Sequence, residues 1–400
     1  MTTTIDFDVS VSNEVDETRD TVHRFAEEVL RPIGRRLDKM ADANEVIAPD
    51  SPLWEVFKRY RALELPDPSE AQPPISLEAA RLRSVISEEL GWGDSGLAIS
   101  LGVSGFPKML ATLSGNQELM ERFANDQVIG CWPITEPDHG SDLILMGGHS
   151  QQISGRLNCV ARRQGSDYVI SGQKSAWVSN GTIATAAALF CAVADADGGI
   201  CGLGAFLVPL DGSGVRRGPP LQKLGQRSLN QGEIFFDDVR IPAHYMVLPP
   251  ELGPLTVDSV LTAANGGMGA TFVGVARAAL EAAIDYARER IQGGTAIIEH
   301  QSVRSRLFKM YRLTQAARAL SRHEVLYNGT TQPPSLPLAI ASKVTATETA
   351  FEVANMALQL FGANGLTLEY PIEKLLRDAR ASMIEDGCNE VLGILGGGRL

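Results

Sequence analysis

Residues suited to binding a flat, hydrogen-bonding ligand lie near the end of the first third of the chain. An apolar stretch, residues 128–134, ends just before Pro137, which should end a strand because proline lacks a backbone donor. Turn-forming and hydroxyl-bearing residues then continue to Asp142. At the strand end, Trp132 can stack on a ring and Thr135 can donate a hydrogen bond. The pattern predicts a ligand-binding loop, although an ordinary strand and turn would give the same pattern.

The overall composition limits the possible partners. The chain has 400 residues, enough for a large core and two or three domains. Its net charge of −12 argues against nucleic acid or an anionic membrane as a general partner. No apolar run approaches the roughly 20 residues that span a bilayer, and the acidic N-terminus lacks a signal pattern. We therefore expect a cytoplasmic protein that has no nucleic-acid or membrane partner.

The cysteines and histidines do not form a recognisable metal site. The five cysteines show no C-x-x-C or zinc spacing, and the six histidines form no H-E-x-x-H cluster. The cysteines read instead as reduced, mostly buried small residues. We expect no bound metal.

Apolar periodicity divides the chain into three domains and predicts an α+β, mainly α fold. Residues 1–127 read as helical, residues 128–246 as short strands separated by Gly, Asp and Ser, and residues 247–400 as long helices. Strands are expected at residues 158–163, 168–171, 189–194, 204–209 and 233–239. In the last domain, Gly266 and Gly274 share one helix face, where a neighbouring helix or a ligand could approach closely.

Two segments around the expected β domain resemble signatures of the acyl-CoA dehydrogenase family of flavoproteins. TEPDHGSD is similar to the family form TEP-x-A-G-S-D, with His139 in place of the small residue. ISGQKSAWVSNG, residues 170–181, resembles G-x-K-x-W-[IV]-[ST]-N with one extra residue before Trp177. The resemblance implies that the first segment wraps the flavin ring, that Trp177 shields the ring and that Ser179 hydrogen-bonds to it. Alone, the second segment would also fit a core tryptophan on a hairpin.

Two further segments extend the resemblance over nearly the whole chain. Residues 290–301, RIQGGTAIIEHQ, resemble R-x-x-F-G-x-x-[IL]-x-x-x-Q, with Gly293 in place of the aromatic residue. Residues 359–365, QLFGANG, resemble Q-[IL]-x-G-G-N-G, with Ala363 in place of a glycine. In the family, the arginine reaches the flavin diphosphate across a subunit interface. The resemblance implies an N-terminal helical domain, a middle β-barrel-like domain and a C-terminal four-helix bundle.

The resemblance also implies FAD as the cofactor and assigns residues to it. The residues implied to bind FAD are Trp132, Ile134, Thr135, Gly140, Ser141, Trp177, Ser179, Arg290, Gln301, Gln359, Gly362, Cys388 and Glu390. The residues implied to contact the substrate are Ser141, Asn265 and Gly387.

The catalytic base of the family is the point at which this chain departs from the pattern. The base is the Glu of Y-E-G-[TS]-x-x-[IL], which removes the α-proton of an acyl thioester while the flavin takes the β-hydride. Here the segment reads IEDGCNEV, and Gly387 fixes the register so that Asp386 stands at the base position and Glu385 at the Tyr position. Asp386 could be a shorter base, the base could be lost, or Glu385 could replace it. The alternative base on the small-residue helix is absent, because the matching residue is Ala264.

These features predict an FAD-dependent acyl-CoA dehydrogenase. The acyl thioester is tethered to coenzyme A or to an acyl carrier protein, and the shorter base favours a compact branched, cyclic or substituted acyl group. The resemblance implies an electron-transfer flavoprotein as electron acceptor and a homotetramer as the assembly. The alternatives are a flavin monooxygenase or another reaction on the same fold, and a partner subunit of a hetero-oligomeric dehydrogenase.

Overall fold

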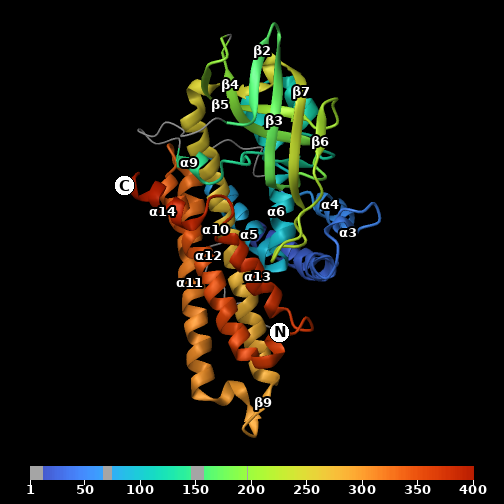
Figure 1. Cartoon of the computed structure of the whole chain (residues 1–400). Coiled ribbons are helices and arrows are strands. Elements are labelled where there is room, and N and C mark those ends of the chain that lie inside the picture. Colours follow the sequence, from blue (N-terminus) through green and yellow to red (C-terminus); the bar gives the residue numbers. More distant parts are fainter. Residues whose placement is uncertain (1–11, 66–73, 146–156, 196) are drawn as a thin grey trace.

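The computed structural model describes residues 12–65, 74–145, 157–195 and 197–400. Helices occupy the N-terminal part, a mixed β-sheet follows, and a bundle of long helices ends the chain (Figure 1). This order matches the expected sequence of helical, β and helical regions. The expected boundaries of the three domains stay predictions.

The N-terminal region is helical in the part that the structure describes. Its helices are α1 (Asn13–Phe25), α2 (Arg31–Asp38), α3 (Ala43–Val46), α4 (Leu53–Arg61), α5 (Leu77–Gly93), α6 (Ser95–Val103), α7 (Phe106–Ser114) and α8 (Gln117–Phe123). Side chains of Ser12, Ser76 and Asp94 accept hydrogen bonds from backbone N–H groups in the first turns of α1, α5 and α6. A π-helical segment, Ala26–Leu30, joins α1 to α2, and Pro32, which cannot donate a backbone hydrogen bond, lies in the first turn of α2.

The middle region is a mixed sheet with a buried central strand. Its strands are β1 (Gly130–Cys131), β2 (Val160–Gln164), β3 (Asp167–Ser179), β4 (Ala186–Ala194), β5 (Ile200–Pro209), β6 (Val215–Arg217), β7 (Gln231–Pro242) and β8 (Met246–Leu248). The order is β6-β7-β3-β2-β4-β5-β8, and β1 pairs with β4 off this path. Both β1 and β2 are parallel to β4. Every residue of β4 is buried, which explains its continuous apolar sequence.

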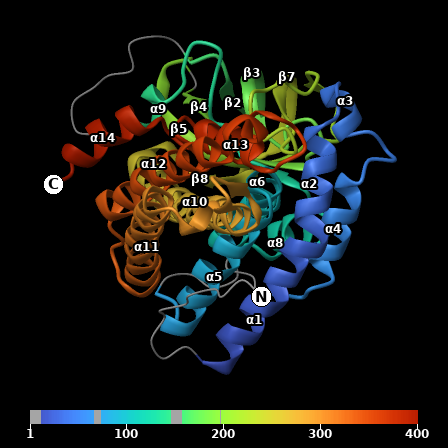
Figure 2. The same ribbon diagram turned by 90° about the horizontal axis from the view of Figure 1, so that it is seen from below.

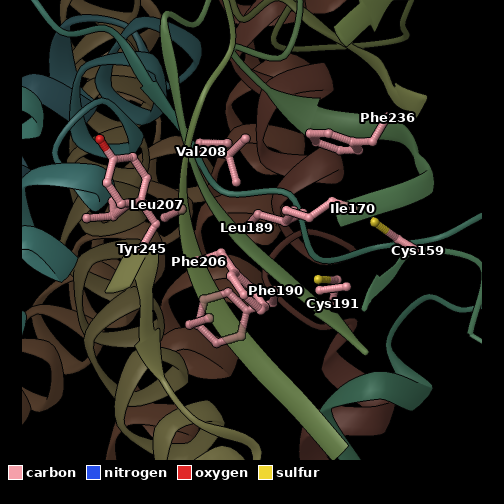
Figure 3. Packing of buried hydrophobic residues seen from close by; sticks show 14 of the residues in the cluster. Cys159, Ile170, Leu189, Phe190, Cys191, Phe206, Leu207, Val208, Phe236 and Tyr245 are labelled. Atoms are coloured by element: carbon pink, nitrogen blue, oxygen red, sulfur yellow. The ribbon is translucent and has the colours of Figure 1, made fainter. Parts of the chain in front are cut away.

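The core of the sheet is built from aliphatic and aromatic side chains of several strands. Figure 3 shows Phe190 of β4 beside Phe206 of β5, with Cys159 and Cys191 in the same cluster. These two cysteines are buried and unbridged, as expected for reduced small residues. The expected strand at residues 128–134 is shorter in the structure, where β1 covers only Gly130–Cys131, since the chain then leaves the sheet to form the loop.

The C-terminal region is a helical bundle that extends away from the sheet (Figure 1). It contains α10 (Gly253–Glu289), α11 (Gln301–Thr330), α12 (Leu336–Phe361), α13 (Ile372–Ser382) and α14 (Asn389–Gly397). A short helix, α9 (Asp142–Leu145), precedes β2, and a hairpin of β9 (Ile291–Gln292) and β10 (Thr295–Ala296) lies at the far end of the bundle. Short 3₁₀ turns are η2 (Ala243–Tyr245), η3 (Pro250–Leu252), η4 (Ile297–Glu299) and η5 (Gly362–Leu366).

Glycines allow α5 and α10 to pack with their backbones in contact. A Cβ atom at Gly91 would lie 2.0 Å from the Thr271 carbonyl oxygen, and one at Gly274 would lie 2.1 Å from the Glu88 carbonyl oxygen. At Gly274 the close approach expected for the small-residue segment is therefore made by α5 from the N-terminal region, whereas Gly266 faces Glu324 of α11. Figure 2 shows α5 between the N-terminal helices and the bundle.

A buried ion-pair network ties the same helices together. The Arg277 guanidinium on α10 donates 2.7 Å hydrogen bonds to both Glu88 and Glu89 of α5. Arg318 of α11 contacts Glu88 at 3.0 Å. These side chains are almost fully buried, so their charges must pair with one another. The network joins three helices into one unit next to the site described below.

Two helical stretches are long and apolar enough, by composition alone, to span a bilayer. Among the described residues they are Ser95–Ser114 and Val257–Glu289. Most of the second stretch is buried inside the protein. Its apolar composition is therefore explained by its position at the centre of the bundle.

Candidate active site

A large cavity lies where the sheet, the N-terminal helices and the C-terminal bundle meet. Its volume is about 1640 Å³, larger than the roughly 300–1,000 Å³ typical of a drug-sized ligand. Residues from the β1 loop, β3, α5, α10, α11 and the turn before α14 line it. It therefore has room for a large cofactor and a substrate side by side.

A buried ion pair shapes the loop that follows β1. The Lys174 ammonium of β3 lies 2.7 Å from the Glu136 carboxylate, and both side chains are buried. Lys174 also donates to the Ile134 carbonyl at 2.9 Å, and Glu136 accepts backbone N–H groups of Asn158 and Cys159. Because each polar group is paired, the loop has one defined conformation.

The rest of this loop is closed by His139. Its Nδ1 lies 2.8 Å from the Asp142 carboxylate, while its backbone pairs with Glu136. Gly140 N–H donates to the other Asp142 oxygen at 2.6 Å. The unusual histidine in the first signature therefore has a structural role: it holds the turn that presents Ser141 to the cavity.

An irregularity in β3 places Trp177 at the cavity. The pairing of β3 with β7 shifts between Lys174 and Val178, where β3 contains more residues than its partner strand. The extra residue in this motif is thus absorbed as a bulge. Trp177 is 59% exposed and lines the cavity. An exposed tryptophan beside an open cavity is suited to cover a flat ligand.

Side-chain amides order the strand end next to Trp177. Gln231 of β7 donates to the Ser179 hydroxyl at 3.1 Å, and both residues line the cavity. Asn180 is fully buried and donates to the carbonyl oxygens of Ser100 and Gly130 at 2.8 and 3.2 Å. It adopts a left-handed backbone, φ 60°, which asparagine tolerates. These bonds link α6, β1 and β3 at the site.

The turn between α13 and α14 presents Asp386 to the cavity. Asp386 and Gly387 have φ angles of 49° and 91°, a left-handed conformation that Asp and Gly accept better than most residues. The buried ammonium of Lys343 holds the turn through the Gly387 carbonyl and the Asn389 side chain, each at 2.8 Å. The Asp386 carboxylate itself forms no hydrogen bond with the residues that the structure describes.

The surroundings of Asp386 make it a stronger base than a solvated aspartate. Burial raises the pKa of the Asp386 carboxyl, and the Lys343 ammonium offsets part of this rise. Burial also lowers the pKa of Lys343 to about 8. Asn265 of α10 donates to the Asp386 carbonyl oxygen at 3.4 Å. The backbone of the turn is thus supported from α10 and α12, while the carboxylate faces the cavity.

Glu385 lines the same cavity but is held by a partner. Gln226 donates to its carboxylate at 3.0 Å. Burial raises the pKa of Glu385 to about 7, and the nearby Lys223 ammonium opposes this rise. Burial likewise lowers the pKa of Lys223 to about 8. Glu385 is therefore anchored on the side of Gln226 and Lys223, whereas Asp386 is free to reach a ligand.

The structure brings most residues of the first two motifs to the cavity. The predicted site residues that line it are Trp132, Ile134, Thr135, Gly140, Ser141, Trp177, Ser179, Asp386 and Gly387. Asn265 and Cys388 lie just behind this wall, Asn265 through its bond to Asp386 and Cys388 through its N–H bond to Ser141. Trp132 was expected to stack on a ligand, but its ring stacks on Phe106, with the ring centroids 5.0 Å apart. Its buried Nε1 has no partner among the described residues and remains available as a donor.

The remaining predicted cofactor residues lie elsewhere on the chain. Arg290, Gln301, Gln359, Gly362 and Glu390 are exposed and do not line the cavity. The first four lie at the end of the bundle that carries the β9–β10 hairpin (Figure 1). They are not brought together with Trp177 within one chain.

Several cavity residues were not singled out by their sequence patterns as site residues. They are Gln231 and Glu324, together with Gln226, which holds Glu385 from behind. Glu324 could have been found from periodicity. It follows Leu307, Met310, Thr314, Ala317 and Ser321 at steps of three and four, which places it on the buried face of α11. A carboxylate on such a face is unusual and indicates a function or a partner.

Comparison with known proteins identifies the family. The protein-family model for the acyl-CoA dehydrogenase middle domain matches residues 131–239, and the family model for the C-terminal domain matches residues 255–399. A probable acyl-CoA dehydrogenase, fadE25 of Mycobacterium leprae, is 29% identical over 383 residues, covering 94% of this chain and 93% of that protein. The chain belongs to the acyl-CoA dehydrogenase family, whose members are oxidoreductases.

Solved structures agree with this assignment at the level of the fold. Butyryl-CoA dehydrogenase from Megasphaera elsdenii superposes with a TM-score of 0.83 at 24% identity, over 98% of this chain and 99% of that one. A glutaryl-CoA dehydrogenase of Mycobacterium smegmatis in complex with FADH2 has a TM-score of 0.80 at 24% identity, over 97% and 94% of the two chains. Family membership gives FAD as the cofactor.

The residues present fit a flavin. The cavity offers an exposed indole at Trp177, an unpartnered buried N–H at Trp132 and the hydroxyls of Thr135, Ser141 and Ser179 along one wall. This combination of a flat apolar surface and converging donors suits a planar ring with polar edges. Asp386 belongs to a different part of the same cavity, so cofactor and base come from separate elements.

Proposed function

We propose that the protein catalyses the FAD-dependent α,β-dehydrogenation of an acyl thioester, with Asp386 as the base that removes the α-proton. The observation that carries this proposal is the Asp386 carboxylate. It lines the cavity shared with Trp177 and Ser179, its pKa is raised by burial, and no described residue hydrogen-bonds to it. A general base requires this combination of access and basicity.

The chain's own residues then have distinct tasks. Trp132, Thr135, Trp177 and Ser179 would hold the flavin ring. The Ser141 hydroxyl accepts the Cys388 N–H at 3.1 Å, so its own proton can be donated to a ligand. The cofactor, when bound, supplies the acceptor for the β-hydride. The Cα–H bond breaks with its proton passing to an Asp386 oxygen, and its electrons form the new carbon–carbon double bond.

The reach of Asp386 supports a compact acyl group. An aspartate is one methylene shorter than glutamate, so its carboxylate ends roughly 1.5 Å farther from the substrate on the same backbone. Misplacement of this size costs on the order of 10²-fold in rate. A branched, cyclic or substituted acyl group that binds deeper offsets this distance. Small residues on α10, among them Ala263, Ala264 and Gly267, line the cavity and leave room for it.

The experiment that tests the proposal is anaerobic mixing of the FAD-loaded protein with a panel of acyl-CoA thioesters, followed by absorbance. Bleaching of the flavin by a branched or cyclic acyl-CoA, faster than by straight-chain acyl-CoA, supports the proposal. If no thioester reduces the flavin, the proposal is contradicted. That result would favour the alternative, a flavin monooxygenase or another reaction on the same fold. Repeating the panel with acyl carrier protein thioesters identifies the carrier.

We further propose a homotetramer in which the far end of each bundle contacts the FAD of a neighbouring subunit. Arg290 follows the last residue of α10 and lies 24 residues beyond Gly266, which corresponds to roughly 36 Å along a helix. It cannot contact a ligand in its own chain's cavity. Large exposed apolar side chains, Ile291, Phe308 and Leu366, lie in the same region and suit an interface. An electron-transfer flavoprotein is the proposed acceptor. Light scattering of the holoprotein tests the assembly, and a monomer that retains FAD contradicts it.

A further inference from the structure

Glu324 is a buried carboxylate at the wall of the cavity. It lies on α11, and its residue is 1% exposed. It packs against Gly266 of α10: a Cβ atom at position 266 would lie 2.8 and 2.9 Å from the two carboxylate oxygens. The glycine is thus required for the carboxylate to occupy this place. Both residues line the cavity.

Only one of the two Glu324 carboxylate oxygens has a hydrogen-bond partner among the described residues. Its Oε1 accepts the side-chain N–H of Asn328 at 2.7 Å. Asn328 is itself fixed, since it donates to the Ser335 carbonyl and accepts the Ser335 N–H. Oε2 is buried and has no partner among the described residues. The side chain is therefore held in position with one oxygen unpaired.

No cation neutralises this carboxylate in the described part of the chain. Burial raises the pKa of Glu324 to about 7, opposed only by the Asn328 hydrogen bond. An unpaired buried carboxylate costs several kcal/mol unless a ligand supplies the missing partner. The Arg277 network provides a contrast in the same bundle, because every carboxylate there contacts an arginine. Glu324 thus has one carboxylate oxygen, Oε2, for which the described residues provide no partner.

The position of Glu324 relative to Asp386 indicates which end of the substrate it would meet. Asn265, next to Gly266 in the chain, contacts the Asp386 backbone. Asp386 and Glu324 therefore approach adjacent residues of α10, from the turn before α14 and from α11. Apolar residues of α5, Ile86 and Leu90, line the same cavity. A thioester with its α-carbon at Asp386 can extend its acyl group along this wall toward Glu324.

We propose that Glu324 recognises a hydrogen-bond donor, an ammonium or a hydroxyl group, at the distal end of the acyl group. The inference rests on the proposed acyl thioester dehydrogenation and defines its substrate class. The donor satisfies Oε2, and an ammonium also neutralises the carboxylate. A purely alkyl end leaves Oε2 unpaired, and a distal carboxylate is repelled. The site would thus discriminate by polarity, since losing a partner of a buried polar group is far costlier than losing a methylene.

The test compares matched substrates on the FAD-loaded protein. Each ω-aminoacyl-CoA and ω-hydroxyacyl-CoA in a series of increasing chain length is compared with its unsubstituted parent by anaerobic flavin reduction. The donor-bearing thioester of the right length should exceed its parent in kcat/KM by on the order of 10- to 100-fold, the value of a hydrogen bond to a charged group. The amino and hydroxyl series distinguish a cationic from a neutral donor.

Variants assign the preference to one side chain. Glu324→Gln should abolish it while leaving the parent thioesters within about threefold. Glu348→Gln, an exposed glutamate on α12, is the matched control and should retain the preference. If Glu324→Gln fails to fold, Glu324→Asp should weaken the preference without abolishing it. The proposal is overturned if the protein shows no preference for a donor, or if Glu324→Gln lowers both substrate series equally.

A binding measurement separates this inference from the proposed reaction. A 3-thia analogue of the preferred thioester has sulfur at the β-position and so has no β-hydride to transfer. Calorimetry should show that Glu324→Gln weakens its binding by the same 10- to 100-fold factor, on the order expected for a charged hydrogen bond. If this holds while no thioester reduces the flavin, the recognition stands and the dehydrogenation fails. Equal binding to parent and variant overturns the recognition.

Discussion

The two faces of the cavity differ in how they are built. The face formed by the β1 loop and β3 keeps most of the family's motifs, and a buried ion pair between Lys174 and Glu136 fixes the loop behind it. The other face is formed by α11 and by the turn before α14, and this turn departs from the family motif at Glu385 and Asp386. It presents the Asp386 carboxylate, to which no described residue donates a hydrogen bond, and Glu324, whose Oε2 has no partner among the described residues.

The difference separates the face that would bind the cofactor from the face that would bind the substrate. A face whose backbone is fixed by internal ion pairs and hydrogen bonds binds a ligand through a preset shape, as a cofactor requires. A face with unpaired, basic carboxylates is completed only by a ligand that supplies protons or donors. We infer that specialisation of this chain lies in its substrate, and the following predictions test that division.

The largest effect is expected at Asp386. Asp386→Asn keeps a residue that tolerates the left-handed backbone but removes the base, so the rate of flavin reduction should fall about 10²- to 10⁴-fold. Stopped-flow absorbance with a saturating substrate measures the rate. Asp211→Asn, an exposed position, is the control and should react at the parental rate. An Asp386→Asn protein that reduces its flavin as fast as the parent would place the base elsewhere.

Breaking the buried pair of the cofactor face should destabilise the protein. Lys174→Met leaves Glu136 charged and buried, at a cost of about 3–5 kcal/mol in the free energy of unfolding. The exposed pair Arg216–Asp237 is the control, and Arg216→Met should cost less than about 1 kcal/mol. Denaturant unfolding with and without added FAD measures both. Equal losses at the two pairs would contradict a specially preorganised cofactor face.

The unpaired carboxylate of Glu324 should appear in the pH dependence of stability. Its folded pKa of about 7 lies above the ordinary 4.5, so the folded state binds the proton more tightly. Stability relative to Glu324→Gln should therefore fall as pH rises from about 4.5 to 7 and stay lower above 7, by on the order of 3 kcal/mol. Unfolding of the parent and variant across this range measures the difference. A pH-independent difference would mean that Glu324 is paired in solution.

The smallest effect is expected at Glu385. Glu385→Gln keeps a side chain that Gln226 can hydrogen-bond, and Asp386 is untouched. Flavin reduction should change by less than about tenfold, because a positioned base alone contributes 10²–10⁴-fold. The same stopped-flow assay decides the result. A loss as large as that of Asp386→Asn would show that Glu385 is the base and that Asp386 supports it.

The sequence predicted the parts of the molecule that depend on local pattern. The order of helices and strands follows from periodicity, and Pro32 marks the π-helical junction of α1 and α2. The buried strand β4 was recognisable over residues 189–194 from its apolar run, although pairing with β1 and β5 extends it to Ala186. Motif order placed Trp177 and Ser179 at the site because both belong to one continuous strand.

Features that depend on contacts between residues far apart in the chain could not be predicted from local sequence patterns. Trp132 was expected to stack on a ligand, but Phe106 of α7 occupies a face of its ring. The anchoring of Glu385 by Gln226 joins residues 159 positions apart, and no periodicity reports such a contact. The role of His139 was likewise hidden, because its pairing with Asp142 becomes meaningful only once the loop is closed by Lys174 and Glu136.

The contact of α5 with α10 at Gly91 and Gly274 has a consequence for how such chains can be recombined. At these two points a single added methyl group would overlap the opposite backbone. A chimaera that takes residues 1–127 from a relative must therefore bring a glycine at the position of Gly91 to pack against Thr271 of α10, or the two helices separate and the cavity opens. Substitutions in the first and last thirds of the chain must therefore remain compatible at this contact, although the β domain lies between them in sequence.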